Sequence, residues 1–181
     1  MALVVTITGS PAQGSRTAQL TAQVGAALAG EGFEVEAINV RDLPPEDLLA
    51  GRGEVTALRG PLALIERARG VVVSTPVYKA AYSGVLKVFL DLLPQTALAG
   101  KVVLPLVTGG TAAHVLAIDY ALRPVLLSLG AQHVVAGLFI LDKLIERQAH
   151  GGIGLDPEIK GRLDGVLADF AGSVRRREAH P

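Results

Sequence analysis

Two stretches decide the fold: LVVTIT at residues 3–8, followed by GSPAQGSRT at 9–17, and GVVVST at residues 70–75, followed by PVYKAAYSG at 76–84. Each begins with a run of β-branched residues, which is typical of a buried strand. Each then passes through a loop of small and polar residues into a helical pattern. In an open parallel sheet, ligands bind outside the carboxyl ends of the strands, where the strand order reverses. If these two strands are neighbours at that point, their loops face each other across one crevice.

The rest of the chain continues to alternate between strands and helices. Further strands are predicted at residues 34–40, 102–107 and 134–140, and helices at 16–28, 61–69, 83–93, 113–129 and 156–177. This alternation indicates an α/β fold in three layers, with helices on both faces of a parallel sheet. We expect one domain over residues 1–181, with a five-stranded parallel sheet in the order 2-1-3-4-5. Residues 41–60 are predicted to be irregular and residues 142–155 to form a mobile loop.

The composition excludes several classes of protein. Lysine plus arginine and aspartate plus glutamate both total 17, so the net charge is zero, whereas a nucleic-acid-binding protein would carry a basic face. Cysteine is absent, which excludes disulfides and thiolate sites, and the four histidines are too widely spaced to predict a metal site.

No apolar run reaches the roughly 18 residues of a membrane span, and no signal peptide precedes the first strand, so a cytoplasmic protein is expected. The hydrophobic fraction of 50% together with 21 glycines predicts a further buried surface, most simply a subunit interface.

The first loop has the chemistry of a phosphate site. Its glycines fall only at positions 9 and 14, so it is neither a Walker A loop nor a dinucleotide fingerprint. Instead, hydroxyls from Ser10, Ser15 and Thr17 gather with the guanidinium of Arg16 at the start of a helix. Backbone N–H groups and the helix dipole favour an anion there, and arginine can bind phosphate oxygens bidentately. The alternative is an ordinary strand-to-helix loop with Ser15 as the N-cap.

The second loop is predicted to hold a flat ring. It contains two of the three tyrosines of the chain, near the end of one strand. The residues that would support the ring are Pro76, Val77, Tyr78, Lys79 and Ala80, and the turn after the fourth strand would add backbone donors from Thr108, Gly109, Gly110 and Thr111. The alternative is that the tyrosines only cover the end of the sheet and that Lys79 is solvated.

These motifs together resemble the NADPH-dependent FMN reductase family. The similarity runs through TPVYKAAYSG at residues 75–84 and LDLL at 90–93, and the first loop matches through GSP at 9–11 and SR at 15–16. GKVVLPL at 100–106, TGGT at 108–111 and DYALRPV at 119–125 match the fourth strand and the helix after it. The resemblance covers residues 3–138 and is nearest to the SsuE-type reductases, which supply reduced FMN to alkanesulfonate monooxygenases. It carries no site residue over from 139–155.

The resemblance implies a flavodoxin-like fold, with FMN and NADPH as cofactors and NADH as an alternative to NADPH. It also implies a homotetramer and a flavin-dependent monooxygenase as partner. Hydride would pass from nicotinamide C4 to flavin N5, so the cofactors carry the chemistry and no catalytic side chain is expected. Two other functions stay open. One is a flavoenzyme that retains FMN and reduces quinones or azo dyes, and the other is a flavodoxin-type electron carrier that oxidises no nicotinamide nucleotide.

The fourth predicted helix contains a proline that it must accommodate. Pro124 has no N–H and cannot bond to the carbonyl of Tyr120, so the helix must bend or insert a wide turn there. Wide π-turns are rare and often mark functional sites. The resemblance implies the same feature, because SsuE-type reductases carry a tyrosine insertion in this helix that forms a π-helix at a tetramer interface. A simple proline kink, with Tyr120 as a packing residue, is the alternative.

Overall fold

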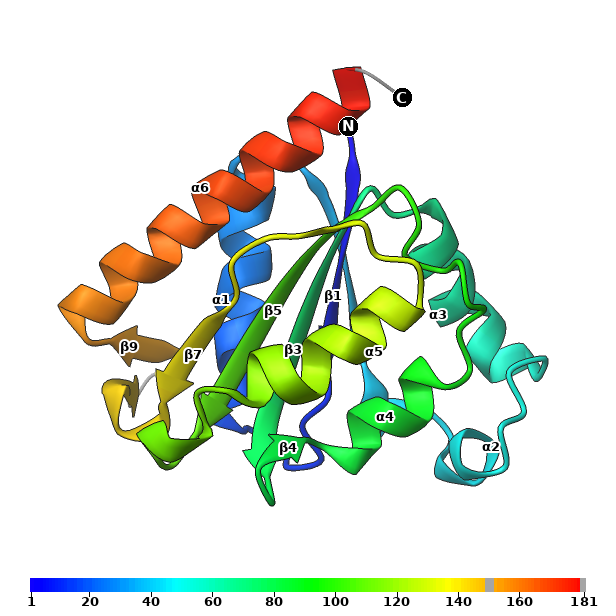
Figure 1. Ribbon diagram of the computed structural model, residues 1–181, viewed down its shortest axis with the longest axis horizontal. Helices are drawn as coiled ribbons and strands as arrows, with labels where there is room; N and C mark the ends of the chain where they lie inside the picture. Colours follow the sequence, from blue (N-terminus) through cyan, green and yellow to red (C-terminus); the bar gives the residue numbers. More distant parts are fainter. Residues whose placement is uncertain (149–151, 180–181) are drawn as a thin grey trace.

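A parallel sheet forms the centre of the computed structural model, which describes residues 1–148 and 152–179 (Figure 1). Its strands are β1 (Leu3–Thr8), β2 (Glu34–Asn39), β3 (Gly70–Tyr78), β4 (Ala81–Tyr82), β5 (Val102–Gly109), β6 (His133–Val134) and β7 (Leu138–Leu141). The path through the sheet is β2-β1-β3-β5-β6, with every pair parallel, and β7 also pairs in parallel with β5. The predicted order 2-1-3-4-5 is therefore confirmed, with β6 and β7 together forming the predicted fifth strand. The predicted count of five strands is wrong, because that strand is broken in two and β4 adds an antiparallel pair with β3.

The break between β6 and β7 lies opposite a proline. Pro105, in the middle of β5, has no N–H to donate toward this neighbour, so an unbroken ladder cannot form. The Val135 N–H still donates to the Val103 carbonyl at 3.0 Å, and pairing resumes between Leu106 and Leu138. A Cβ atom on Gly137 would lie only 2.8 Å from Pro105 Cγ, so glycine is needed where the chain passes the proline.

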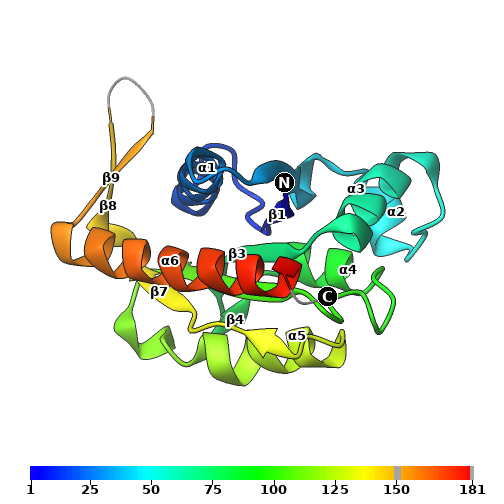
Figure 2. The same cartoon turned by 90° about the horizontal axis from the view of Figure 1, so that it is seen from above.

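Helices cover both faces of the sheet (Figures 1 and 2). One face packs against α1 (Arg16–Gly30) and α6 (Pro157–Ala179), and the other against α3 (Thr56–Arg67), α4 (Gly84–Leu90) and α5 (Arg123–Ser128). Successive residues of β3 alternate between the two cores, since Val71 and Val73 pack on the α3 side and Val72 on the α1 side. β5 is buried along its whole length, whereas β2 is largely exposed at the edge. Burial of the central strands on both faces explains why they read as unbroken apolar runs.

The predicted helix starts are largely correct. The Ser15 hydroxyl caps α1 by accepting from the Ala18 N–H at 3.0 Å, and the Asp156 carboxylate accepts from the Glu158 N–H at 3.0 Å at the start of α6. The predicted irregular stretch overlaps η1 (Val40–Asp42) and contains α2 (Pro45–Leu49), and α3 begins within it rather than at Pro61. Pro61 forfeits one backbone bond inside α3, while the buried apolar residues of the helix lie on both sides of it and hold the helix to the core.

The predicted fourth helix is divided into three segments: η2 (Ala112–His114), the π-helix η3 (Ile118–Leu122) and α5. The Arg123 N–H donates to the Ile118 carbonyl, five residues back, which is the π pattern. Tyr120 lies within η3, and Pro124 is the second residue of α5, which follows η3 directly. The prediction of a wide turn is confirmed, in place of a simple kink.

The predicted mobile loop at 142–155 is wrong for the residues that the structure describes there. They form the short helix η4 (Asp142–Leu144) and the antiparallel hairpin β8 (Ile145–Arg147) and β9 (Ile153–Leu155). Ile145 and Ile153 are buried in the α1–α6 core, which anchors the base of the hairpin, and Figure 2 shows β8 and β9 projecting from the body of the molecule. Gly151, His150 and His180 lie outside the described residues. None of the helices within 1–148 and 152–179 is long and apolar enough to cross a membrane.

Candidate functional site

The carboxyl ends of β1, β3 and β5 meet at a pocket of ≈ 180 Å³. Most of the predicted site residues line it, namely Ser10, Ser15, Arg16, Thr17, Pro76, Val77, Tyr78, Thr108 and Gly109, together with Ala12, Asp142 and Arg147. The remaining predicted residues lie beyond its rim. Lys79 and Ala80 form the exposed tip of the β3–β4 turn, and Gly110 and Thr111 are exposed after β5. The two stretches that decide the fold therefore do meet across one crevice.

The first loop is held firmly to α4. The Gly9 N–H donates to the Ser74 carbonyl at 2.8 Å, and the Ser83 hydroxyl donates to the Gly9 carbonyl. Ser83 is itself fixed, because its N–H donates to Thr75 Oγ1 at 3.0 Å. A Cβ atom on Gly9 would lie 2.5 Å from Leu86 Cβ, so the close approach of loop and helix requires glycine. These bonds aim the rest of the loop into the pocket.

Ser10 has the clearest chemical signal in the pocket. It is 1% exposed, and within the described chain its Oγ has no hydrogen-bond partner. A buried hydroxyl without a partner is destabilising, and such groups are rare in folded proteins. In the same pocket, the hydroxyls of Thr17 and Thr108 lie 2.7 Å apart and join the start of α1 to the end of β5. An anion with several acceptor oxygens, placed at the N-terminus of α1, would satisfy the Ser10 hydroxyl.

Two arginines cross between the first loop and the hairpin. Arg16 Nε donates to the Ile145 carbonyl at 2.9 Å, and Arg147 Nη2 donates to the Gly14 carbonyl at 2.9 Å. Arg147 and Asp142 were not predicted as site residues. No local pattern could have indicated them, because Arg147 bonds to a residue far away in the sequence and the segment that carries both residues was predicted only as a loop.

The β3–β4 turn is conformationally strained. Lys79 and Ala80 have φ values of 50° and 65°, a region that side-chain-bearing residues seldom adopt. They are the two loop residues of a hairpin whose last pair is Tyr78 with Ala81. Tyr78 is 48% exposed at the pocket edge. Tyr82 is half-buried against the core, and this burial raises the pKa of its phenol, although the charge of Lys87 opposes the shift.

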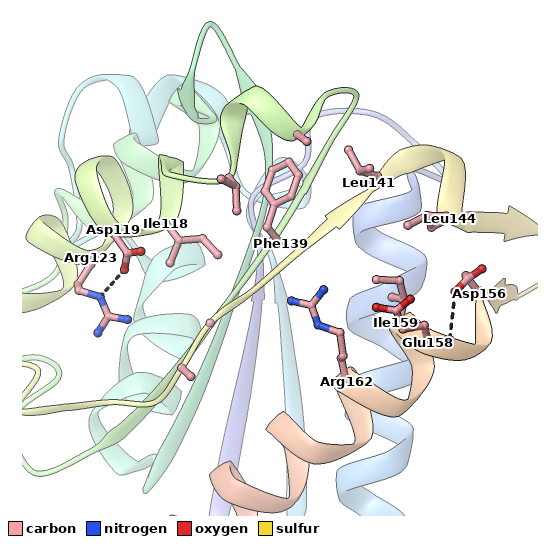
Figure 3. A pocket seen from close by; sticks show the side chains of 14 residues that line it. Ile118, Asp119, Arg123, Phe139, Leu141, Leu144, Asp156, Glu158, Ile159 and Arg162 are labelled. Atoms are coloured by element: carbon pink, nitrogen blue, oxygen red, sulfur yellow. Dashed lines mark hydrogen bonds and ion pairs between the residues drawn. The ribbon is translucent and has the colours of Figure 1, made fainter.

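A larger cavity of ≈ 650 Å³ lies elsewhere, between η3, β7 and the first turns of α6 (Figure 3). Its charged residues are the cations Arg123 and Arg162 and the anions Asp119, Asp156 and Glu158, with Asp119 and Arg123 paired at 3.0 Å. Carboxylates outnumber guanidinium groups there. Among the described residues that line the ≈ 180 Å³ pocket, by contrast, there are two arginines and one aspartate, and the pocket lies at the start of α1. An anionic ligand is therefore favoured in the smaller pocket.

Comparisons with known proteins agree with this geometry. Residues 2–145 match the family model for NADPH-dependent FMN reductase. The chain is 46% identical to an FMN reductase (NADPH) of Escherichia coli over 97% of this chain and 91% of that protein. It is 49% identical to an FMN reductase (NADPH) of Pseudomonas putida over 97% of this chain and 89% of that protein.

Among solved structures, the apo form of the NADH:FMN oxidoreductase EMOB superposes with a TM-score of 0.87 at 41% identity, covering 96% of this chain and 90% of that one. A flavodoxin from Streptococcus pneumoniae shares the fold at a TM-score of 0.64 and 17% identity, covering 95% and 99% of the two chains. The flavodoxin-like fold is thereby confirmed. The chain belongs to the NADPH-dependent FMN reductase family, and it is an oxidoreductase whose cofactors are FMN and NAD(P)H.

Proposed function

We propose that the ≈ 180 Å³ pocket binds the phosphate end of FMN and that NAD(P)H reduces the flavin at its mouth. The observation that carries the proposal is the buried hydroxyl of Ser10, which has no hydrogen-bond partner within the described residues and lines the same pocket as Ser15 and Arg16 at the start of α1. FMN bears a terminal phosphate and a flat ring, which are the two groups that the first and second loops suit. The functions named for the relatives support the same ligand.

The phosphate would be held by donors of the first loop. Ser10 can donate its hydroxyl hydrogen, and so can Ser15, whose oxygen is already engaged as the acceptor of the α1 cap. Arg16 uses Nε for the Ile145 carbonyl, which leaves its two terminal NH2 groups for phosphate oxygens. Thr17 would contribute through its hydroxyl, which is hydrogen-bonded to the hydroxyl of Thr108.

The ring would lie against the β3–β4 turn and the segment from Thr108 to Thr111. Bound FMN supplies the redox chemistry by accepting a hydride from the nicotinamide. The chain would position the ring through backbone groups of residues 76–80 and 108–111, beside the Tyr78 side chain that lines the pocket. We propose no acid or base side chain for this step, since a hydride transfer between two cofactors needs none.

The small pocket volume bears on how tightly FMN is kept. Sites that enclose a ligand of this size measure about 300–1,000 Å³, so a pocket of ≈ 180 Å³ leaves much of the ring uncovered. We propose that FMN is released as a substrate, as in SsuE-type reductases, and that reduced FMN passes to a monooxygenase, with an alkanesulfonate monooxygenase as the candidate. We place this activity in the cytoplasm.

A second subunit would cover the ring, and the exposed face from η2 to α5 is the candidate surface for a homotetramer. Large apolar side chains are exposed along it, namely Val115, Leu116, Tyr120 and Leu127, with Tyr120 at 79%. The π-helix that presents Tyr120 is the feature shared with the SsuE-type pattern.

Titration of the flavin tests the site. Ser10→Ala and Arg16→Ala should weaken FMN binding by about 10- to 150-fold, the range for a hydrogen bond to a charged group. The rate of hydride transfer in flavin-saturated enzyme should change much less. Unchanged FMN affinity in both variants would show that the FMN phosphate does not bind at this loop.

Two further assays separate the alternatives. Bleaching of the visible flavin band by NADPH distinguishes a reductase from an electron carrier, which would not oxidise the nucleotide. A sequential dependence of rate on NADPH and FMN distinguishes a released flavin from a retained one, which would give ping-pong kinetics with a second acceptor. Absence of bleaching, or ping-pong kinetics with retained FMN, would contradict the corresponding part of the proposal.

Deletion of Tyr120 tests the tetramer. The variant should convert the π-helix to regular α-helix, weaken subunit association in sedimentation and release FMN less completely in gel filtration. A deletion variant with unchanged assembly and FMN release would leave Tyr120 with only a packing role.

A further inference from the structure

Arg147 lines the phosphate pocket but lies beyond residues 2–145, the part of the chain that the family model matches. It is the last residue of β8, and its Nη2 donates to the Gly14 carbonyl at 2.9 Å. Arg16 donates in the opposite direction, from Nε to the Ile145 carbonyl at 2.9 Å. Each arginine therefore bonds to a carbonyl of the other's segment, which clasps the β8–β9 hairpin to the first loop.

The clasp places two guanidinium groups at one pocket. A guanidinium has five N–H donors, and each of these bonds uses one of them, so both arginines keep donors for a ligand. Asp142 is the carboxylate that lines the same pocket. Two arginines against one aspartate leave a net positive charge, which adds to the positive end of α1.

This charge suits a phosphate monoester, which carries close to two negative charges at neutral pH. Asp142 offsets the charge of Arg16, so Arg16 and the helix end balance little of the phosphate charge, whereas a second guanidinium restores a net positive charge at the site. The two arginine–carbonyl bonds hold the hairpin against the first loop. An anion that bonds to both arginines would link the hairpin and the loop once more.

We propose that Arg147 is a second guanidinium ligand of the flavin 5′-phosphate and that it makes the site select FMN over riboflavin. The inference rests on the proposed function, because it requires the flavin phosphate to bind at residues 9–17. Arg147 binds the part of the flavin remote from the reacting ring, so it contributes to affinity and to selection of phosphorylated flavin. The β8–β9 hairpin thereby supplies a residue that binds the ligand.

The test compares FMN with riboflavin, which lacks the phosphate. Fluorescence titrations of both flavins would be run on the parent, on Arg147→Ala and on Arg147→Gln, which keeps a donor for the Gly14 carbonyl but loses the charge. Lys143→Ala is the matched control, since it removes an exposed cation from η4 that does not line the pocket. We expect both Arg147 variants to weaken FMN binding about tenfold, the low end for a charge-assisted bond because Arg147 is exposed. Riboflavin affinity should change in neither Arg147 variant, and Lys143→Ala should bind both flavins like the parent. The loss of FMN affinity in the Arg147 variants should become smaller at high salt.

An equal loss for both flavins would mean that Arg147 only tethers the hairpin, and no loss for either would mean that it does not touch the ligand. Either result overturns the inference. Ser10→Ala, titrated in the same series, separates this failure from failure of the proposed site. If Ser10→Ala loses FMN affinity while the Arg147 variants do not, the phosphate stays at the first loop and only the role of Arg147 falls. If Ser10→Ala and the Arg147 variants all bind FMN like the parent, the proposed site itself is wrong.

Discussion

Relaxing the β3–β4 turn should stabilise the protein. Lys79 and Ala80 lie at φ 50° and 65° in a two-residue hairpin loop, a pattern that strongly favours Asn followed by Gly. A residue with a side chain pays about 1–2 kcal/mol in the left-handed region. Glycine avoids that cost but loses about 0.5–1 kcal/mol more backbone entropy on folding. Counting a similar gain from asparagine, the double variant Lys79→Asn/Ala80→Gly should raise the free energy of unfolding by about 1–2 kcal/mol.

Thermal and urea unfolding would measure the gain. For a chain of this length, 1 kcal/mol corresponds to about 2–4 °C in Tm, so we expect an increase of about 2–8 °C. Ala81→Gly is the matched control, because Ala81 lies in β4 outside the left-handed region. The same chemical change should there lower stability by about 0.5–1 kcal/mol. A double variant no more stable than the parent, alongside a destabilised control, would refute the strain.

The same variant tests whether the strain serves the site. If the turn supports the flavin ring, the looser backbone must be ordered again on binding, so FMN affinity should fall by about two- to fivefold. Strain that persists at a ligand site is held there by the surrounding structure. A more stable variant with unchanged or tighter FMN binding would show that the turn does not need its rigid form for the ligand.

Other predictions concern packing and pH. Gly9→Ala should destabilise the fold by about 1–3 kcal/mol and weaken FMN binding, because the added Cβ would lie 2.5 Å from Leu86 Cβ. Gly84→Ala, where a Cβ meets nothing within 4 Å, should be neutral or slightly stabilising, and equal unfolding curves for the two variants would contradict the steric argument. Burial raises the pKa of the Tyr82 phenol above its ordinary 10.0, so as the pH rises Tyr82 loses its phenolic proton in the unfolded chain before it does so in the folded chain. The corresponding stability is present below pH 10.0 and is lost as the pH rises toward the folded pKa. Tyr82→Phe should therefore lose less stability than the parent in urea unfolding above pH 10.0, and an identical alkaline loss in both would contradict the shift.

Local sequence features predicted the elements that depend on neighbours in the chain. The β-branched runs marked β1 and β3, and the hydroxyl of Ser15 and the carboxylate of Asp156 marked two helix starts. Pro124 indicated the wide turn of η3 because its missing N–H affects a carbonyl only four residues away. The same local logic failed at Pro61, where packing of α3 outweighed the cost of one lost backbone bond.

The sequence by itself also predicted the general position of the ≈ 180 Å³ pocket, because the carboxyl ends of parallel strands lie at one edge of the sheet. It could not place the hairpin or Arg147. The Arg16–Ile145 bond joins residues 129 positions apart, and the Arg147–Gly14 bond joins residues 133 apart. The break opposite Pro105 likewise depends on which strand lies beside β5. Such features arise from contacts between distant segments, which the chain makes only after the sheet has brought them together, so only the tertiary structure decided them.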